Sequence, residues 1–128
     1  MMDVLIAGAG GFVGSAARYA LTTWVTTRLA SGTLFPWGTL SVNILGSLAI
    51  GALVGAMVEL GDLSERARLL LVVGVLGGFT TFSAFSNETF ALARTGQEAM
   101  AAGYVAATLV AGIAAVWAGY AGARAVAG

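Results

Sequence analysis

Charged residues are so sparse in this chain that they divide it into four long apolar stretches. The stretches cover residues 4–29, 36–58, 69–94 and 99–123. A helix needs about 20 residues, each rising about 1.5 Å, to cross the roughly 30 Å of hydrocarbon in a bilayer. Each stretch is long enough, so the sequence predicts an all-α integral membrane protein. We expect one domain, residues 1–128, with four transmembrane helices.

The composition excludes several other classes of protein. Charged residues make up 9% of the chain, whereas soluble domains carry about 25%. The chain contains no histidine or cysteine, which excludes imidazole and thiol catalysis and His/Cys metal sites. A net charge of zero gives no electrostatic attraction to nucleic acid. Because the connections between the stretches are short, we expect the function to lie within the membrane and the protein not to be an enzyme.

The arginines are nearly balanced between the two ends of the predicted bundle. Arg66, Arg68 and Arg124 lie on one side and Arg28 and Arg94 on the other, while Arg18 lies inside the first stretch. Membrane proteins normally orient themselves by an excess of basic residues in the cytoplasmic connections. Two interpretations remain open: another feature sets the orientation, or both orientations insert and pair as an antiparallel, dual-topology homodimer.

The third stretch contains an unusual polar segment, GGFTTFSAFSNE, at residues 77–88. Adjacent glycines weaken a helix, and the hydroxyl groups that follow cannot be satisfied by lipid. Backbone that leaves the helix at membrane depth is tolerated only inside protein or beside a polar cavity, and ion sites are typical of such breaks. The segment therefore predicts a broken third helix and a functional site beside it.

A glycine-rich run at residues 8–14 has the GxxGxxG spacing of nucleotide-binding turns. Such a turn needs a strand before it and a carboxylate about 20 residues later, and neither is present. We therefore expect no nucleotide. Gly10, Gly14 and Arg18 recur every four residues and form one stripe on a helix, which favours close helix packing.

Several polar side chains are candidates for an ion pathway. Arg18 either extends toward the interface or draws an anion into an aqueous vestibule. Thr39 and Asn43 share a helix face and offer donors to one point, although Asn43 alone fits an interhelical hydrogen bond equally well. Tyr104 and Thr108 are also four residues apart.

The polar segment adds aromatic and acidic candidates. Phe82 and Phe85 are three residues apart and form either core or, through their positive ring edges, the lining of an anion route. Ser83 lies between them and adds a hydroxyl donor. Glu88 ends the segment as a solvated charge, or as a gate or proton-carrying group.

Taken together, the motifs GGFVGSAARY, GTLSVNILGS and GGFTTFSAFSNE resemble the Fluc (CrcB-type) family of fluoride ion channels over essentially the whole chain. The resemblance implies a passive, fluoride-selective channel in the cell (plasma or inner) membrane that exports fluoride and relieves its toxicity. It also implies four-helix subunits, each with a broken third helix, paired as antiparallel dual-topology homodimers.

The resemblance assigns roles to individual residues. Phe82 and Phe85 match the pore phenylalanines, Asn43 the pore amide, Arg18 the vestibule arginine, and Tyr104 and Thr108 a polar track. Independently of the resemblance, we expect the Thr39 and Ser83 hydroxyls to be further donors that replace water around fluoride. The track departs from the family at Gly112, which has no hydroxyl. The carbonyls of Gly77 and Thr80 match a structural sodium site at the two-fold axis.

A small proton-coupled multidrug antiporter is the main alternative, since it is also a four-helix dual-topology dimer. That mechanism needs a carboxylate at mid-membrane. Glu88 is the only candidate, and it lies at the edge of its stretch.

Overall fold

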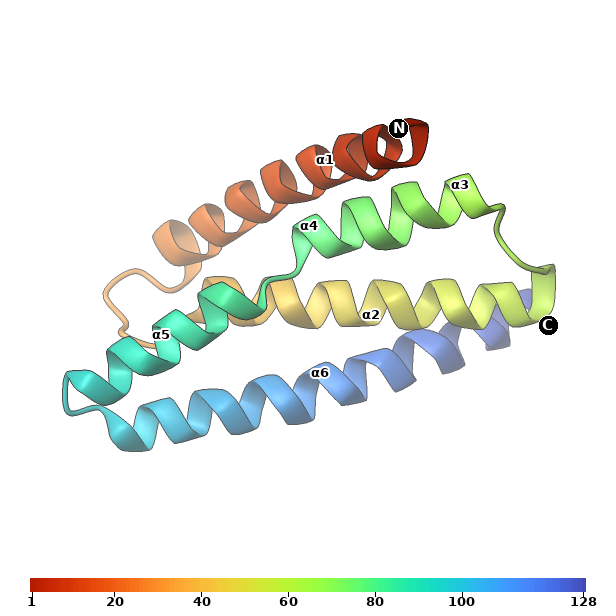
Figure 1. Ribbon diagram of the computed structural model, residues 1–128. Coiled ribbons are helices and arrows are strands. Elements are labelled where there is room, and N and C mark those ends of the chain that lie inside the picture. The colour runs from red at the N-terminus through yellow and green to blue at the C-terminus, as the bar shows by residue number, and fades with distance from the viewer.

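The computed structural model describes residues 1–128 and consists entirely of helices and short connections (Figure 1). The elements in chain order are α1 (Met2–Trp24), η1 (Val25–Leu29), α2 (Trp37–Leu60), α3 (Glu65–Arg68), η2 (Leu69–Leu76), α4 (Gly77–Phe79), α5 (Phe82–Arg94) and α6 (Glu98–Ala127). The two η elements are π-helical. Together they form four helices long and apolar enough to cross a membrane: Met2–Leu29, Trp37–Leu60, Glu65–Arg94 and Glu98–Ala127. The prediction of an all-α protein with four such helices is confirmed.

Glycines end the helices at the short connections. Gly61 follows α2 with φ 96°, and Gly96 follows α5 with φ 81°. Residues that carry a side chain rarely adopt this backbone conformation, so glycine lets the chain turn sharply at these two points. After the first turn, Ser64 caps α3 by accepting a hydrogen bond from the Ala67 N–H at 3.2 Å.

Helices α2 and α6 run in the same direction and form the most extensive contact in the molecule (Figure 1). The contact is close because glycines face backbone. A Cβ atom added at Gly51 would overlap the carbonyl of Val116, and one at Gly119 would overlap that of Leu48. Small residues of this kind let membrane helices approach closely and gain packing energy that lipid does not supply.

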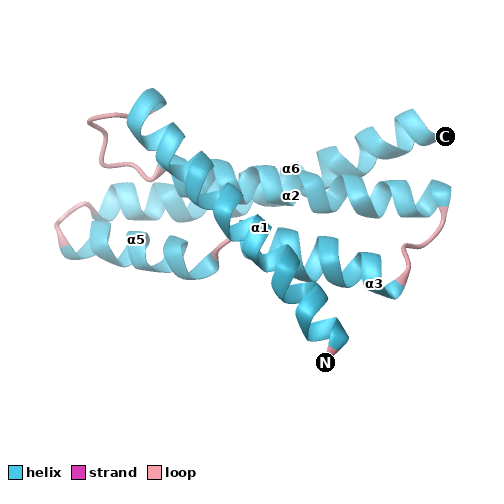
Figure 2. Cartoon of the chain, turned by 90° about the horizontal axis from the view of Figure 1, so that it is seen from above, coloured by secondary structure: helices cyan, strands magenta, loops and turns pink.

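Helix α1 packs in the same manner on the first part of the third span and crosses it obliquely (Figure 2). Gly10 and Gly14 are buried, and a Cβ atom at either would overlap a backbone carbonyl of η2, that of Leu70 or Val75. The helix-packing interpretation of the glycine run is therefore confirmed, and Arg18 lies one turn further along the same stripe.

Few side chains are buried within this chain. Only 17 of 128 residues are buried, and the central cluster is small. It consists of Leu40, Phe85, Leu92, Ala101 and Tyr104. Most large apolar side chains instead point outward, as is expected when lipid or a second protein covers the helices.

Candidate functional site

The third span is interrupted between α4 and α5 (Figure 1). Helix α4 ends at Phe79, and α5 begins at Phe82. Thr80 (φ −82°, ψ 157°) and Thr81 (φ −151°, ψ 117°) have extended backbone between them. The interruption exposes peptide groups that a continuous helix would pair, so their partners must come from elsewhere.

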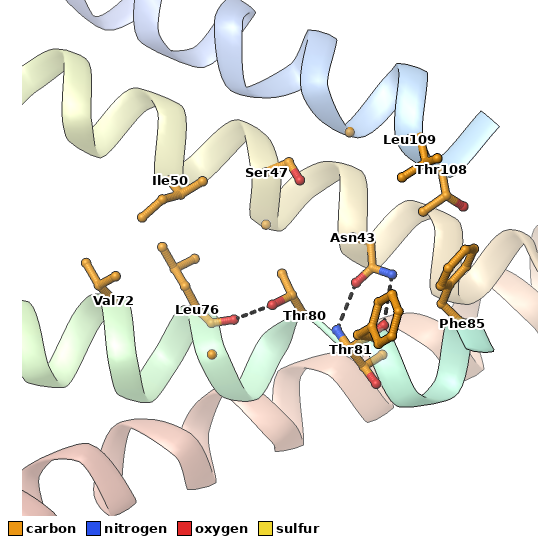
Figure 3. Close-up of a pocket in the computed structure, with 14 residues that line it drawn as sticks. Asn43, Ser47, Ile50, Val72, Leu76, Thr80, Thr81, Phe85, Thr108 and Leu109 are labelled. Carbon is orange, nitrogen blue, oxygen red and sulfur yellow. Dashed lines mark hydrogen bonds between the residues drawn. The ribbon is translucent and has the colours of Figure 1, made fainter. Parts of the chain in front are cut away.

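The side chain of Asn43 on α2 supplies both partners for Thr81 (Figure 3). The Thr81 N–H donates to Asn43 Oδ1 at 2.8 Å, and Asn43 Nδ2 donates to the Thr81 carbonyl at 3.1 Å. An amide offers two donors and an acceptor, so one N–H of Asn43 stays unused by this pairing. Asn43 thus fastens the interruption to α2.

The four backbone carbonyls from Gly77 to Thr80 lose their helical donors at the same place, and that of Gly78 accepts the Ser15 hydroxyl instead. In a continuous helix the Thr81 N–H would donate to the Gly77 carbonyl and the Ala84 N–H to the Thr80 carbonyl. Here Thr81 donates to Asn43, and Ala84 donates to the Thr81 hydroxyl at 3.1 Å. Carbonyl oxygens without a donor suit a hard cation, and no group of three His, Cys, Asp or Glu side chains offers another site. Gly77 and Thr80 therefore fit the sodium ion that the family resemblance implies.

A cavity of about 460 Å³ lies beside the interruption, between α2, the third span and α6 (Figure 3). It brings together six of the residues singled out from the sequence: Asn43, Gly77, Thr80, Phe82, Phe85 and Thr108. Thr108 Oγ1 is buried and has no hydrogen-bond partner. An unpaired buried hydroxyl is costly, which marks this atom as a donor or acceptor for something that enters the cavity.

The two phenylalanines have different surroundings. Phe82 is 78% exposed, whereas Phe85 is 8% exposed and belongs to the core. Their ring centroids are 5.7 Å apart, and Phe85 also meets Tyr104 edge-on at 5.2 Å. Phe85 is therefore both a core residue and part of the cavity lining, so the two interpretations of this side chain are not exclusive.

Glu88 on α5 accepts hydrogen bonds from two side chains, Thr39 and Tyr104, that were predicted to line the ion pathway. The Thr39 hydroxyl donates to Glu88 Oε1 and the Tyr104 hydroxyl to Glu88 Oε2, each at 2.7 Å. Hydrogen bonds to an ionised acceptor are about twice as strong as neutral ones. Both carboxylate oxygens are thus paired inside the subunit, and Thr39 turns away from Asn43 toward this network.

A second, more polar cavity of about 280 Å³ lies on the α1 side of the network. Its lining includes Arg18, Thr39, Thr81 and Glu88. Arg18 Nε is buried without a hydrogen-bond partner. Thr81 lines both cavities, so the interruption separates them. Ser83 lies at the exposed surface, 3.3 Å from the Thr81 hydroxyl, and lines neither cavity.

Sequence reasoning missed three contributors to this site. Thr81 caps α5 and connects the interruption to Asn43. Threonine is a preferred N-cap residue, and this preference could have revealed the first role. Ser15 on α1 reaches the Gly78 carbonyl at 3.4 Å. Gly46 leaves room for the methyl group of Thr80, and a Cβ atom there would overlap it.

Comparison with known proteins decides the family. Residues 5–120 match the model of the family described as CrcB-like protein, Camphor Resistance (CrcB). The chain belongs to this family. A relative from Agrobacterium fabrum, named fluoride-specific ion channel FluC, is 48% identical over 94% of this chain and 95% of its own. A relative of the same name from Rhizobium meliloti is 43% identical over 98% of this chain and 99% of its own. Another from Thermus thermophilus is 47% identical over 91% of this chain and 89% of its own.

Membership of the CrcB-like family and four apolar helices make this chain a multi-pass membrane protein. The match covers the whole site, because α1, α2, the interruption and most of α6 lie within residues 5–120. The named CrcB-like relatives are ion channels rather than enzymes.

Proposed function

We propose that this protein is a passive, fluoride-selective channel that exports fluoride across the cell membrane. The observation that carries the proposal is an uncharged, mainly apolar cavity beside the interruption whose lining includes amide, hydroxyl and aromatic groups, in a chain 48% identical to a protein named as a fluoride-specific channel. Fluoride enters cells as neutral hydrogen fluoride from acid surroundings and is trapped inside as the anion. A passive route out relieves this accumulation.

The cavity chemistry suits a small, strongly hydrated anion. Water around the ion has to be replaced by donors, and the unused N–H of Asn43 and the unpaired hydroxyl of Thr108 provide two. The positive edges of the Phe82 and Phe85 rings add weak attraction without a fixed charge. Conduction requires several weak sites rather than one strong site, and this lining meets that requirement.

The second cavity supplies the remaining part of the pathway. Arg18 carries a positive charge beside the cavity and attracts an anion from the aqueous vestibule. The network of Thr39, Glu88 and Tyr104 contains two hydroxyl groups that can turn from the carboxylate to the ion. Ser83 lines neither cavity but supplies a further exposed hydroxyl beside Thr81, which lines both.

A structural sodium ion at the carbonyls of Gly77 and Thr80 is part of the proposal. The diverted N–H groups of Thr81 and Ala84 support it, since they leave these oxygens without helical donors. Sodium would supply positive charge that holds the interruption open, and the protein contributes only backbone oxygen at that position.

An antiparallel, dual-topology homodimer completes the proposed channel. Phe82, which lines the cavity, is 78% exposed on one subunit, so a second surface is needed to enclose the route. The nearly equal numbers of arginines at the two ends support insertion in both orientations. Two inverted copies would provide eight helices around the pathway.

Flux from liposomes tests the function. Purified protein in liposomes loaded with potassium fluoride should release fluoride once valinomycin removes the charge imbalance, and chloride-loaded liposomes should not release chloride. Fluoride release no faster than from empty liposomes would exclude the channel. Proton-driven uptake of a cationic drug instead would establish the multidrug antiporter.

A further inference from the structure

The amide of Asn43 touches both backbone groups of Thr81, which lies between the two proposed sodium ligands. We propose that Asn43 is a positioning residue for sodium: it draws the Thr81 N–H away from the Gly77 carbonyl and so keeps that oxygen available to the cation. This inference rests on the proposed function, because it joins the fluoride pathway and the sodium site through one side chain.

The first step is a competition for a single N–H group. Helical geometry would give the Thr81 N–H to the Gly77 carbonyl. The short contact of 2.8 Å gives it to Asn43 Oδ1 instead. Because lipid offers no acceptor, the N–H must go to one of the two, and whichever acceptor wins determines whether the helix continues.

The second step is a parallel competition one turn later. Thr81 Oγ1 accepts the Ala84 N–H at 3.1 Å, so the Thr80 carbonyl also loses its helical donor. The Thr81 hydroxyl therefore takes the helical donor away from the Thr80 carbonyl, as the Asn43 amide takes it away from the Gly77 carbonyl. Gly77 and Thr80 are two of the four carbonyls that the interruption leaves without a helical donor, and they are the two that the proposed sodium site uses.

The third step links the cation to the anion. Asn43 Nδ2 donates one N–H to the Thr81 carbonyl at 3.1 Å. The other N–H is unused by this pairing, and Asn43 lines the cavity. An ion that fixes Gly77 and Thr80 also fixes Thr81 and hence the orientation of this amide. Linkage is reciprocal, so if bound sodium favours the hydrogen bonds between Asn43 and Thr81, those hydrogen bonds favour sodium binding by the same factor.

Thermal unfolding of the purified protein in detergent tests this inference without measuring flux. Tm is measured against sodium concentration, with N-methylglucamine replacing sodium at constant ionic strength. In Asn43→Leu, an apolar side chain of similar size, the Thr81 N–H returns to Gly77, and the sodium concentration for half the Tm rise should increase at least tenfold. In Asn43→Asp the carboxylate still accepts that N–H, so the sodium response should persist while fluoride flux falls more than tenfold.

Ser41→Ala is the matched control, because Ser41 lies on the same helix and lines neither cavity. It should respond to sodium as the wild type does. If Asn43→Leu does not fold, Thr81→Val, which removes the acceptor for the Ala84 N–H, should show the same tenfold increase. A wild-type sodium response in Asn43→Leu, or in Thr81→Val when only that variant folds, overturns the inference. Absence of any sodium response in the wild type also overturns it, while fluoride flux, measured separately, decides the proposed function.

Discussion

At the scale of single residues, Phe82 and Phe85 line one cavity but differ in burial, and this difference separates their effects on stability from their effects on transport. We expect Phe85→Ile to lower the free energy of unfolding by about 1–2 kcal/mol, because the smaller side chain leaves space beside Tyr104. Phe82→Ile should lower the free energy of unfolding less, because this side chain has few contacts within its own chain. Both should lower fluoride flux more than tenfold, about 1.4 kcal/mol of added barrier, since an aliphatic group has no positive ring edge.

Phe90→Ile provides the control for these measurements. Phe90 lies on the same helix α5, is 63% exposed and lines neither cavity. Its replacement should change neither flux nor unfolding in detergent. Full fluoride flux in folded Phe82→Ile and Phe85→Ile proteins would show that these rings do not line the pathway.

The Glu88 network makes a second prediction at this scale. Tyr104→Phe removes the 2.7 Å hydrogen bond to Glu88 Oε2 in a fully buried place. We expect a loss of about 1–3 kcal/mol in the free energy of unfolding, because Glu88 Oε2 loses its hydrogen-bond donor at a buried position. Tyr19→Phe is the matched change at a tyrosine that is 73% exposed and makes no hydrogen bond, and it should have no effect. Equal stability of the two variants would contradict a contribution from this hydrogen bond.

Residue types and spacing predicted part of this site. The polar segment, Asn43 and Thr108 were recognisable because hydroxyls and amides are out of place in an apolar helix. Their partners were not recognisable. The hydrogen bond from Thr39 to Glu88 spans 49 positions in the sequence, and that from Asn43 to Thr81 spans 38. Spacing within one helix shows which side chains share a face, but it does not show which neighbouring helix that face meets.

At the scale of helices, glycines set how closely α2 and α6 approach. Gly51→Ala should lower the free energy of unfolding by about 1–3 kcal/mol, because its Cβ would overlap the Val116 carbonyl and the helices must separate. Gly8→Ala, where a Cβ meets nothing within 4 Å, should instead raise it by about 0.5–1 kcal/mol through better helix propensity. Chemical denaturation in mixed micelles measures both. A Gly51→Ala protein as stable as the wild type would mean that the helices separate at no cost.

The four helices were predictable because length and hydropathy alone determine whether a segment spans a bilayer. The π-helical stretches η1 and η2 were not, since no residue in VTTRL or LLLVVGVL marks a change of hydrogen-bond register. Such stretches are local departures within α-helices, and we attribute them here to packing against a neighbouring helix. η2 runs directly against Gly10 and Gly14 of α1, where backbone packs on backbone.

At the scale of the whole molecule, the arginine balance bears on orientation. Arg66, Arg68 and Arg124 lie at one end, but Arg124 is paired with Glu59 at 2.7 Å. Adding three lysines after Gly128 should force one orientation and abolish fluoride flux, because inverted partners are then lacking. Co-expression with Ser31→Lys/Thr33→Lys, which biases the opposite end, should restore flux.

Orientation in each case is read from the accessibility of a single introduced cysteine to a membrane-impermeant reagent. A C-terminal lysine variant that inserts in one orientation and still conducts fluoride alone would exclude the antiparallel dimer. An equal number of added glutamates serves as the control, since acidic residues contribute little to orientation.

The pairing of Asn43 with Thr81 has a consequence for the order in which the protein assembles. Before α2 docks, the third span is surrounded by lipid, where Thr81 has no acceptor except its own helix. We therefore expect the span to enter the bilayer as an unbroken helix and to open only when it docks on α2. A peptide of residues 65–94 in micelles should show slow hydrogen exchange at the Thr81 amide, bonded to Gly77, and a fast exchange rate there would mean that the interruption precedes assembly.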